Sequence, residues 1–417
     1  MAALRPGRAE APEPALIIIL AGVGAALHVG KLAPAIPALR AALDVTLVQA
    51  GFLLSGVQLA GMLLGVAFGV VADGLGGKRS MVLGLLLLAL ASALGGLAQG
   101  VPMLMALRAL EGFGFLLVAL PAPGLLRQAV APGRVNVVLG IWGAYMPLAT
   151  ALALLVGPLW MAALGWRAWW WLLAALSLAL AGWVALGVPA TARAQAAAAQ
   201  GPASPGAAAN PAWLARLRQT LSAPGPWLVA LTFAMYSGQW LAVIGFLPAI
   251  YTQAGVSGGA TGVLTALAAA ANIVGNVGSG RLLQRGVPPP TLLAIGFVAM
   301  ALAAAAAFAQ VGGVAGNGLP PGWRYAAVLM FSGVGGMIPA TLFTLAVRLA
   351  PSERTLSTTV GWVQQWSSFG QFAGPPTVAW VASAAGGWHL TWVATGLCSV
   401  CGLLLTLALA RRARRGA

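Results

Sequence analysis

Long apolar runs recur along the whole chain, and they limit what it can fold into. A bilayer core about 30 Å thick requires roughly 20 consecutive apolar residues for one helical crossing. The chain has 417 residues, of which 60% are hydrophobic and 7% charged. A water-soluble domain carries roughly a quarter charged residues, so this surface suits lipid better than water. We therefore expect an all-α membrane protein.

Twelve such runs can be placed between short polar or glycine-rich segments, and the first of them suits an uncleaved span better than a signal peptide. Their expected limits are 15–38, 47–71, 80–97, 102–126, 137–163, 168–188, 227–252, 259–283, 292–311, 325–349, 357–384 and 390–410.

The longest polar interval, 189–226, divides these runs six and six. Its second part, 211–221, spaces Trp213, Leu214 and Leu217 as one face of a short amphipathic helix, which suits the membrane interface. We expect a cytoplasmic N-terminal tail over 1–14, a six-helix bundle over 15–188, a cytoplasmic linker over 189–226, a second six-helix bundle over 227–410 and a basic cytoplasmic tail over 411–417. Two such bundles joined by a linker are typical of secondary transporters.

The basic residues fix an orientation, because cytoplasmic loops are rich in Lys and Arg. With both termini in the cytoplasm, the outside segments hold Arg40, Arg167 and Arg324 alone. The inside segments hold Arg5, Arg8, Lys78, Arg79, Arg127, Arg134, Arg193, Arg216, Arg218, Arg281, Arg285, Arg348, Arg354, Arg411, Arg412, Arg414 and Arg415. One missed span would reverse every later loop, so the pattern also supports twelve spans.

Other classes of function fit the sequence poorly. The formal net charge is +16, but the basic residues are scattered between apolar runs and not gathered into a nucleic-acid face. Cys398 and Cys401 lie within the last apolar run, where a redox or metal role is not expected. Two histidines, six acids and no nucleophile–base pattern argue against an enzyme. The sequence has no G-x-x-x-x-G-K-[ST] element for ATP, and we expect no cofactor and no metal.

The loop after the second run reads Gly69-Val-Val-Ala-Asp73-Gly-Leu-Gly76-Gly-Lys78-Arg79. Glycines permit a tight backbone turn at the membrane surface. The segment resembles the signature G-x-x-x-D-x-x-G-x-[KR]-[KR] of the major facilitator superfamily. The resemblance implies two pseudo-symmetric six-helix bundles and a cavity lined by helices one, four, seven and ten. It also implies a conformational latch formed by Gly69, Asp73, Gly76, Lys78 and Arg79.

The fourth run contains Arg108-Ala-Leu-Glu111-Gly112-Phe-Gly114, which resembles the family's R-x-x-[QE]-G-x-G element. Gly165-Trp166-Arg167 resembles the entry to helix six, and the second half carries degenerate echoes of both patterns. The resemblance therefore covers nearly the whole chain. The drug-exporter pattern of helix five is incomplete, and the fifth run looks loosely like bacterial cyanate and nitrate-type carriers.

Four ionisable residues lie at membrane depth. At 1.5 Å per residue, Lys31 and Arg108 both lie roughly 10 Å below the outer surface. His28 and Glu111 share a helix face with them, three residues away. We interpret Lys31 and Arg108 as an anion-attracting pair, and Glu111 or His28 as the group that takes up a proton. The alternative is that Arg108 pairs with Glu111 within one helix while Lys31 extends toward the outer surface.

Further polar and aromatic residues complete the expected substrate site. Tyr145, Tyr236, Trp240 and Gln365 are the candidates for substrate contact, although helix–helix hydrogen bonding is the alternative for each. We expect a secondary transporter of the bacterial inner membrane that works as a monomer by alternating access and takes up a small organic or inorganic anion with protons. A drug-exporting proton antiporter is the first alternative, and a non-transporting receptor is the second.

Overall fold

The computed structural model describes residues 14–131, 134–189, 211–310 and 318–415. The expected N-terminal tail, apart from Pro14, lies outside the described residues, as do 190–210 of the linker and the last two residues of the basic tail. Within these ranges the regular elements are helices throughout, and strands are absent.

The N-terminal part forms the helices α1 to α9. Their bounds are α1 (Pro14–Gly30), α2 (Leu32–Leu43), α3 (Leu47–Ser55), the 3-10 turn η1 (Gly56–Gln58), α4 (Leu59–Leu75), α5 (Gly77–Gly95), α6 (Val101–Ala119), α7 (Ala122–Ala129), α8 (Val135–Gly143) and α9 (Tyr145–Gly187).

The C-terminal part begins with the linker helix α11 (Pro211–Ser222). It continues with α12 (Pro224–Gln253), α13 (Gly258–Gln284), α14 (Pro289–Phe308), α15 (Pro321–Gly335), α16 (Met337–Arg348), the 3-10 turn η4 (Glu353–Thr355), α17 (Leu356–Ala384), the 3-10 turn η5 (Trp388–Leu390) and α18 (Thr391–Arg415).

These helices make twelve membrane spans. Ten described segments are long and apolar enough to cross a bilayer. One of them, α9, contains two spans, because Gly165 interrupts it with φ 80° and ψ 167°. The twelfth span is α17, whose 29 residues include the polar run Gln364 to Ser368 that lowers its hydropathy. The predicted fold class of twelve transmembrane helices in two six-helix bundles is confirmed.

Several spans are broken at positions that the local sequence explains. The first span divides at Lys31, and Pro34 has no N–H to donate to the carbonyl of Gly30, where α1 ends. The second span tightens into the 3-10 turn at Gly56–Gln58. At the junction of α4 and α5, Gly76 has φ 80°, a conformation that glycine adopts readily.

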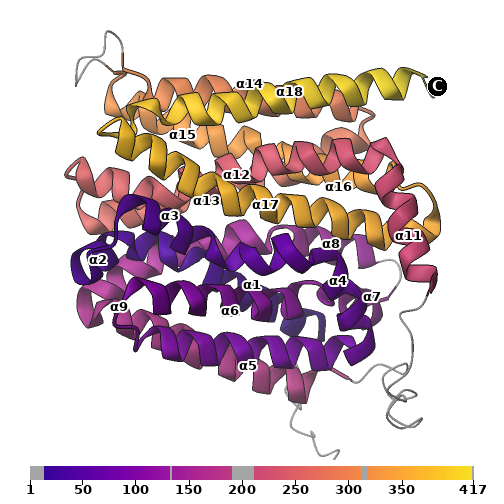
Figure 1. Cartoon of the computed structure of the whole chain (residues 1–417), viewed down its shortest axis with the longest axis horizontal. Coiled ribbons are helices and arrows are strands. Elements are labelled where there is room, and N and C mark those ends of the chain that lie inside the picture. The colour runs from indigo at the N-terminus through magenta and orange to yellow at the C-terminus, as the bar shows by residue number, and fades with distance from the viewer. Residues whose placement is uncertain (1–13, 132–133, 190–210, 311–317, 416–417) are drawn as a thin grey trace, which may run out of the picture.

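The two bundles form the lower and upper halves of Figure 1, with helices α1 to α9 below and α12 to α18 above. They meet where α17 packs along α3 and α4, where α13 packs on α9, and where α2 packs on α12. The end of the molecule that carries α11, at the right of Figure 1, is called the linker end below, and the other is called the far end.

Candidate functional site: a buried charge cluster

Four ionisable side chains of the N-terminal bundle meet at one buried place, called the charge cluster below. Lys31 lies between α1 and α2, His28 lies one turn earlier, and Arg108 and Glu111 lie one turn apart in α6. All four are at most 1% exposed. The spacing of three residues predicted the two pairs, and the family resemblance, with helices one and four lining one cavity, predicted that the pairs converge.

The ammonium group of Lys31 uses all three of its N–H groups. It donates to Glu111 Oε1, to Ser92 Oγ at 2.9 Å and toward His28 Nδ1 at 3.4 Å. It also lies 4.8 Å from the ring of Trp170, a distance that permits a cation–π contact. The alternative in which Lys31 extends toward the outer surface is therefore wrong, because its partners on α5, α6 and α9 hold it inside the bundle.

Arg108 joins three spans. Its Nη1 donates to Glu111 Oε2 at 2.5 Å and to the carbonyl of His28 at 2.6 Å. Its Nε donates to the carbonyl of Leu53 at 3.1 Å, just before the turn η1. Within the described residues, its Nη2 is buried without a hydrogen-bond partner. The pairing of Arg108 with Glu111 inside α6 is thus present, and a second cation shares the same carboxylate.

His28 is held between a hydroxyl and the charged groups. Its Nε2 lies 2.7 Å from Ser177 Oγ, and its Nδ1 lies 3.5 Å from Glu111 Oε1. Because Nδ1 faces an N–H of Lys31, the neutral tautomer with its proton on Nε2, donated to Ser177, fits these contacts. With His28 neutral, the two cations and one carboxylate leave the cluster with a net charge of about +1.

Ser92, Ser177 and Trp170 complete the charge cluster, and our sequence analysis missed them. They come from the third and sixth spans. The sequence feature that could have pointed to the two serines is their place inside apolar runs, because a buried ammonium needs hydrogen-bond acceptors. Because these partners lie on the third and sixth spans, Lys31 and His28 point into the N-terminal bundle.

Two of the other predicted contact residues form a separate network in the C-terminal bundle. Asn272 Nδ2 donates to Tyr236 Oη at 2.9 Å and to the carbonyl of Ser332 at 3.0 Å. Trp240 Nε1 donates to Ser332 Oγ at 3.1 Å. Helix–helix hydrogen bonding, the alternative given for Tyr236 and Trp240, is thus present.

Tyr145 and Gln365 lie elsewhere again. The ring of Tyr145 stacks on Trp142, with ring centroids 4.3 Å apart. Gln365 Oε1 accepts from the N–H of Val66 at 3.1 Å, so it joins α17 to α4. The structure therefore brings the ionisable residues together but leaves the four other contact residues in three separate places.

The predicted latch residues surround the junction of α4 and α5. Gly69 and Asp73 belong to the backbone of α4, and the Asp73 side chain lies outside the described part of the chain. Gly76 makes the bend, Lys78 is half-buried and Arg79 is exposed.

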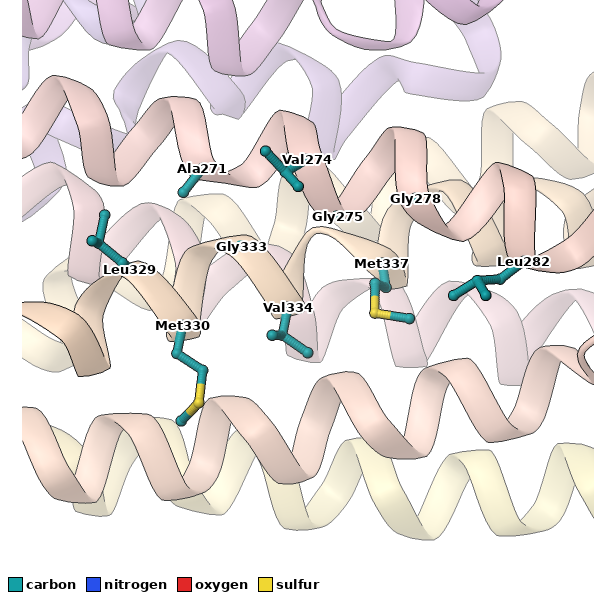
Figure 2. A pocket seen from close by; sticks show the side chains of 10 residues that line it. All are labelled: Ala271, Val274, Gly275, Gly278, Leu282, Leu329, Met330, Gly333, Val334 and Met337. Carbon is teal, nitrogen blue, oxygen red and sulfur yellow. The ribbon is translucent and has the colours of Figure 1, made fainter.

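An apolar cleft of about 380 Å³ lies between α13 and the helices α15 and α16. Figure 2 shows Val274 above it and Val334 and Met337 below it. All of its lining residues are apolar or glycine, so this cleft offers nothing that would bind an ion.

Comparisons with known proteins agree with this architecture. The family model described as Major Facilitator Superfamily matches residues 15–364. The chain belongs to this superfamily. The resemblance predicted from the loop around Asp73 is thus confirmed, and the chain is a major facilitator transporter.

Two crystal structures of a bacterial homolog of the human lysosomal transporter Spinster, both inward-facing, share this superfamily fold. The unoccupied one has a TM-score of 0.71 and 17% identity over 97% of this chain and 98% of that chain. The occupied one has a TM-score of 0.72 and 17% identity over 95% of this chain and 96% of that chain. At this identity the likeness shows the fold alone.

A curated relative is the tetracenomycin C resistance and export protein of Streptomyces glaucescens. It is 26% identical over 158 residues, which are 38% of this chain and 29% of the relative. The matched stretch thus spans less than a third of the relative's length.

Proposed function

We propose that this major facilitator transporter takes up a small anion together with protons by alternating access, and that the charge cluster couples the two. The observation that carries the proposal is the shared carboxylate of Glu111, which pairs with both Lys31 and Arg108 in a buried place. Ionisable groups at membrane depth are costly and commonly mark transport pathways.

The coupling follows from the charges. A proton on Glu111 removes the negative partner of two buried cations, which is costly in a low-dielectric environment. An anion that reaches Lys31 and Arg108 replaces the lost charge, so proton and anion bind more tightly together than apart. The buried Nη2 of Arg108 is an additional donor for such an anion. Linked binding of this kind favours symport.

The remaining predicted residues keep their proposed roles. Tyr145, Tyr236, Trp240 and Gln365 would contact the substrate at other points of its path, and Glu111 or His28 would take up the proton. Gly69, Asp73, Gly76, Lys78 and Arg79 would latch the two bundles at the linker end. The protein would lie in a bacterial inner membrane as a monomer, with both termini and the linker in the cytoplasm.

Reconstitution in liposomes tests the proposal. Uptake of a panel of small organic and inorganic anions is measured with and without an inward proton gradient. The wild type should accumulate at least one anion only when the gradient is present. Lys31→Ala and Arg108→Ala should abolish this uptake, while Arg218→Ala, which removes an exposed cation of α11, should preserve it. Normal uptake by both cluster variants at normal expression would refute the anion site.

Export of hydrophobic compounds is the second candidate, and the similarity to the tetracenomycin C export protein favours it. The incomplete helix-five pattern of drug exporters argues against it. If the same liposomes ignore every anion and instead exchange lipophilic cations for protons, export is the function.

A further inference from the structure

The turn η1 in the second span lies between the charge cluster and the other bundle. The N–H of Leu59 donates to the carbonyl of Gly56, so the chain tightens from α-helical to 3-10 geometry here. A 3-10 segment within a longer helix often marks a hinge, because its hydrogen bonds are poorer.

The fourth span holds one side of this turn. A Cβ atom at Gly112 would lie 3.1 Å from the carbonyl carbon of Val57, and one at Gly56 would lie 3.2 Å from Arg108 Cβ. Backbones approach this closely because both positions are glycine. Arg108 Nε adds its hydrogen bond to the carbonyl of Leu53. The turn therefore rests on the same helical segment that carries Arg108 and Glu111.

The C-terminal bundle holds the other side through Gln58, the last residue of the turn. Gln58 is 2% exposed, and its Nε2 donates to Gln371 Oε1 at 3.0 Å. Ser368 Oγ donates to Gln58 Oε1 at 3.3 Å. These hydrogen bonds cross between the bundles, and they are called the glutamine seam below.

The glutamine seam continues into the seventh span. Gln371 Nε2 donates to Ser367 Oγ at 3.3 Å, and Ser237 Oγ of α12 donates to the carbonyl of Ser367 at 2.8 Å. A continuous set of contacts therefore leads from Glu111 and Arg108 through η1 to α17 and α12. The amide of Gln58 is buried, and a buried amide that loses its partners destabilises the structure, so the hydrogen bonds to Gln371 and Ser368 favour one arrangement of the bundles.

We propose that Gln58 is a positioning residue that couples the charge cluster to the relative placement of the two bundles. Arg108 bonds the carbonyl of Leu53, just before η1, and the geometry of η1 decides whether Gln58 reaches Gln371 and Ser368. Loss of the Arg108 contact would loosen the turn and weaken the glutamine seam. The meaning of this coupling for transport rests on the proposed function, but the coupling itself does not depend on it.

The test measures the separation of the bundles without substrate and at one pH. Spin labels are placed at Ala42→Cys and Ala254→Cys, exposed positions at the far end on the first and seventh spans, in a Cys398→Ala/Cys401→Ala background. The ratio of the population with a short label distance to the population with a long one is compared in wild type, Gln58→Leu, Arg108→Lys and the double variant. Gln371→Leu repeats the experiment from the other bundle.

Coupling predicts that each single variant shifts this ratio and that the double variant departs from the product of the two shifts by about 3-fold or more, as expected for residues linked through shared contacts. Gln371→Leu should behave like Gln58→Leu. Gln239→Leu is the matched control, because Gln239 bonds Ser399 within its own bundle. When it is combined with Arg108→Lys, the shift of the double variant should equal the product of the two single shifts.

Independent shifts from Gln58→Leu and Arg108→Lys, or equal departures in the Gln239 control, would overturn the proposal. The result stands apart from the proposed function. A coupled seam in a protein that ignores protons and anions would support this inference and refute that function.

Discussion

Glu111 is the residue on which the charge cluster depends, because one carboxylate serves two cations. A charged group in an apolar interior is tolerated only when it is paired and hydrogen-bonded. Lys31 meets this condition with three acceptors, whereas Arg108 keeps one nitrogen without a partner among the described residues. The arrangement is stable with Glu111 charged and costly with Glu111 neutral, as a coupling site requires.

Glu111→Gln should uncouple transport from protons. The amide has nearly the shape of the carboxylic acid but cannot lose a proton, so proton-driven uptake should disappear while exchange of substrate across the membrane continues. The unfolding free energy should also fall by about 3 kcal/mol or more, because two buried cations lose their counter-charge. Proton-driven uptake and substrate exchange are compared in liposomes to check the first expectation, and thermal unfolding checks the second.

The exposed acid Glu353 supplies the control. Glu353→Gln should leave proton-driven uptake and stability unchanged. If Glu111→Gln still accumulates substrate with a proton gradient, Glu111 does not couple the two.

Gly84 shows how closely the third and fourth spans pack. A Cβ atom there would lie 2.6 Å from the carbonyl oxygen of Gly114 and 2.8 Å from Leu117 Cβ. Gly84→Val should therefore lower the unfolding free energy by about 1–3 kcal/mol through overpacking. Thermal unfolding in detergent measures it. Gly182→Val, where a Cβ meets nothing within 4 Å, should have little effect, and equal losses in both variants would contradict the packing explanation.

At the scale of elements, the sequence predicted the spans better than their interruptions. The predicted limits of the seventh, eighth and eleventh spans lie within three residues of α12, α13 and α17. Apolar length and loop charge decide these limits, and both are local properties. The break at Lys31, the turn η1 and the division of the tenth span at Gly336 were missed, because they depend on close contact with neighbouring spans.

The candidate site was predicted only in part for the same reason. Spacing of three residues within a helix pairs His28 with Lys31 and Arg108 with Glu111. Which face of the first span turns toward Ser92 and Ser177 depends on how whole helices pack. Sequence periodicity could not show that the hydroxyl of Tyr236 would be bonded to Asn272 of the eighth span.

The junction of the fifth and sixth spans depends on a single residue, Gly165. Its φ of 80° and ψ of 167° lie in a region open essentially only to glycine, and a Cβ there would meet nothing within 4 Å. Gly165→Ala should therefore lower the unfolding free energy by about 1–3 kcal/mol through backbone strain alone. In the helical control Gly182→Ala, stability should stay the same or rise. Unchanged thermal unfolding of Gly165→Ala would show that the junction tolerates another conformation.

The whole molecule has an orientation that its loop charges predict. In a Cys398→Ala/Cys401→Ala background, a membrane-impermeant thiol reagent applied to intact cells should label Ala254→Cys at the far end. It should leave Gln284→Cys at the linker end unlabelled until the cells are opened. Both positions are exposed in the structure, so access to the reagent depends on the side of the membrane. The opposite labelling pattern would place the linker outside the cell and refute the predicted orientation.

The charge of the cluster also predicts how transport responds to voltage. The cluster carries about +1 with Glu111 ionised and His28 neutral, and it keeps that charge when one proton and one monovalent anion bind together. Movement of one net charge across 100 mV corresponds to about 2.3 kcal/mol, or roughly 50-fold in accumulation.

One-to-one symport of a monovalent anion moves no net charge. A potassium diffusion potential set with valinomycin in liposomes should therefore leave accumulation unchanged, while a proton gradient raises it. Accumulation that follows the potential would show that anion and proton do not move one to one, and the cluster would then have to change its charge during the cycle.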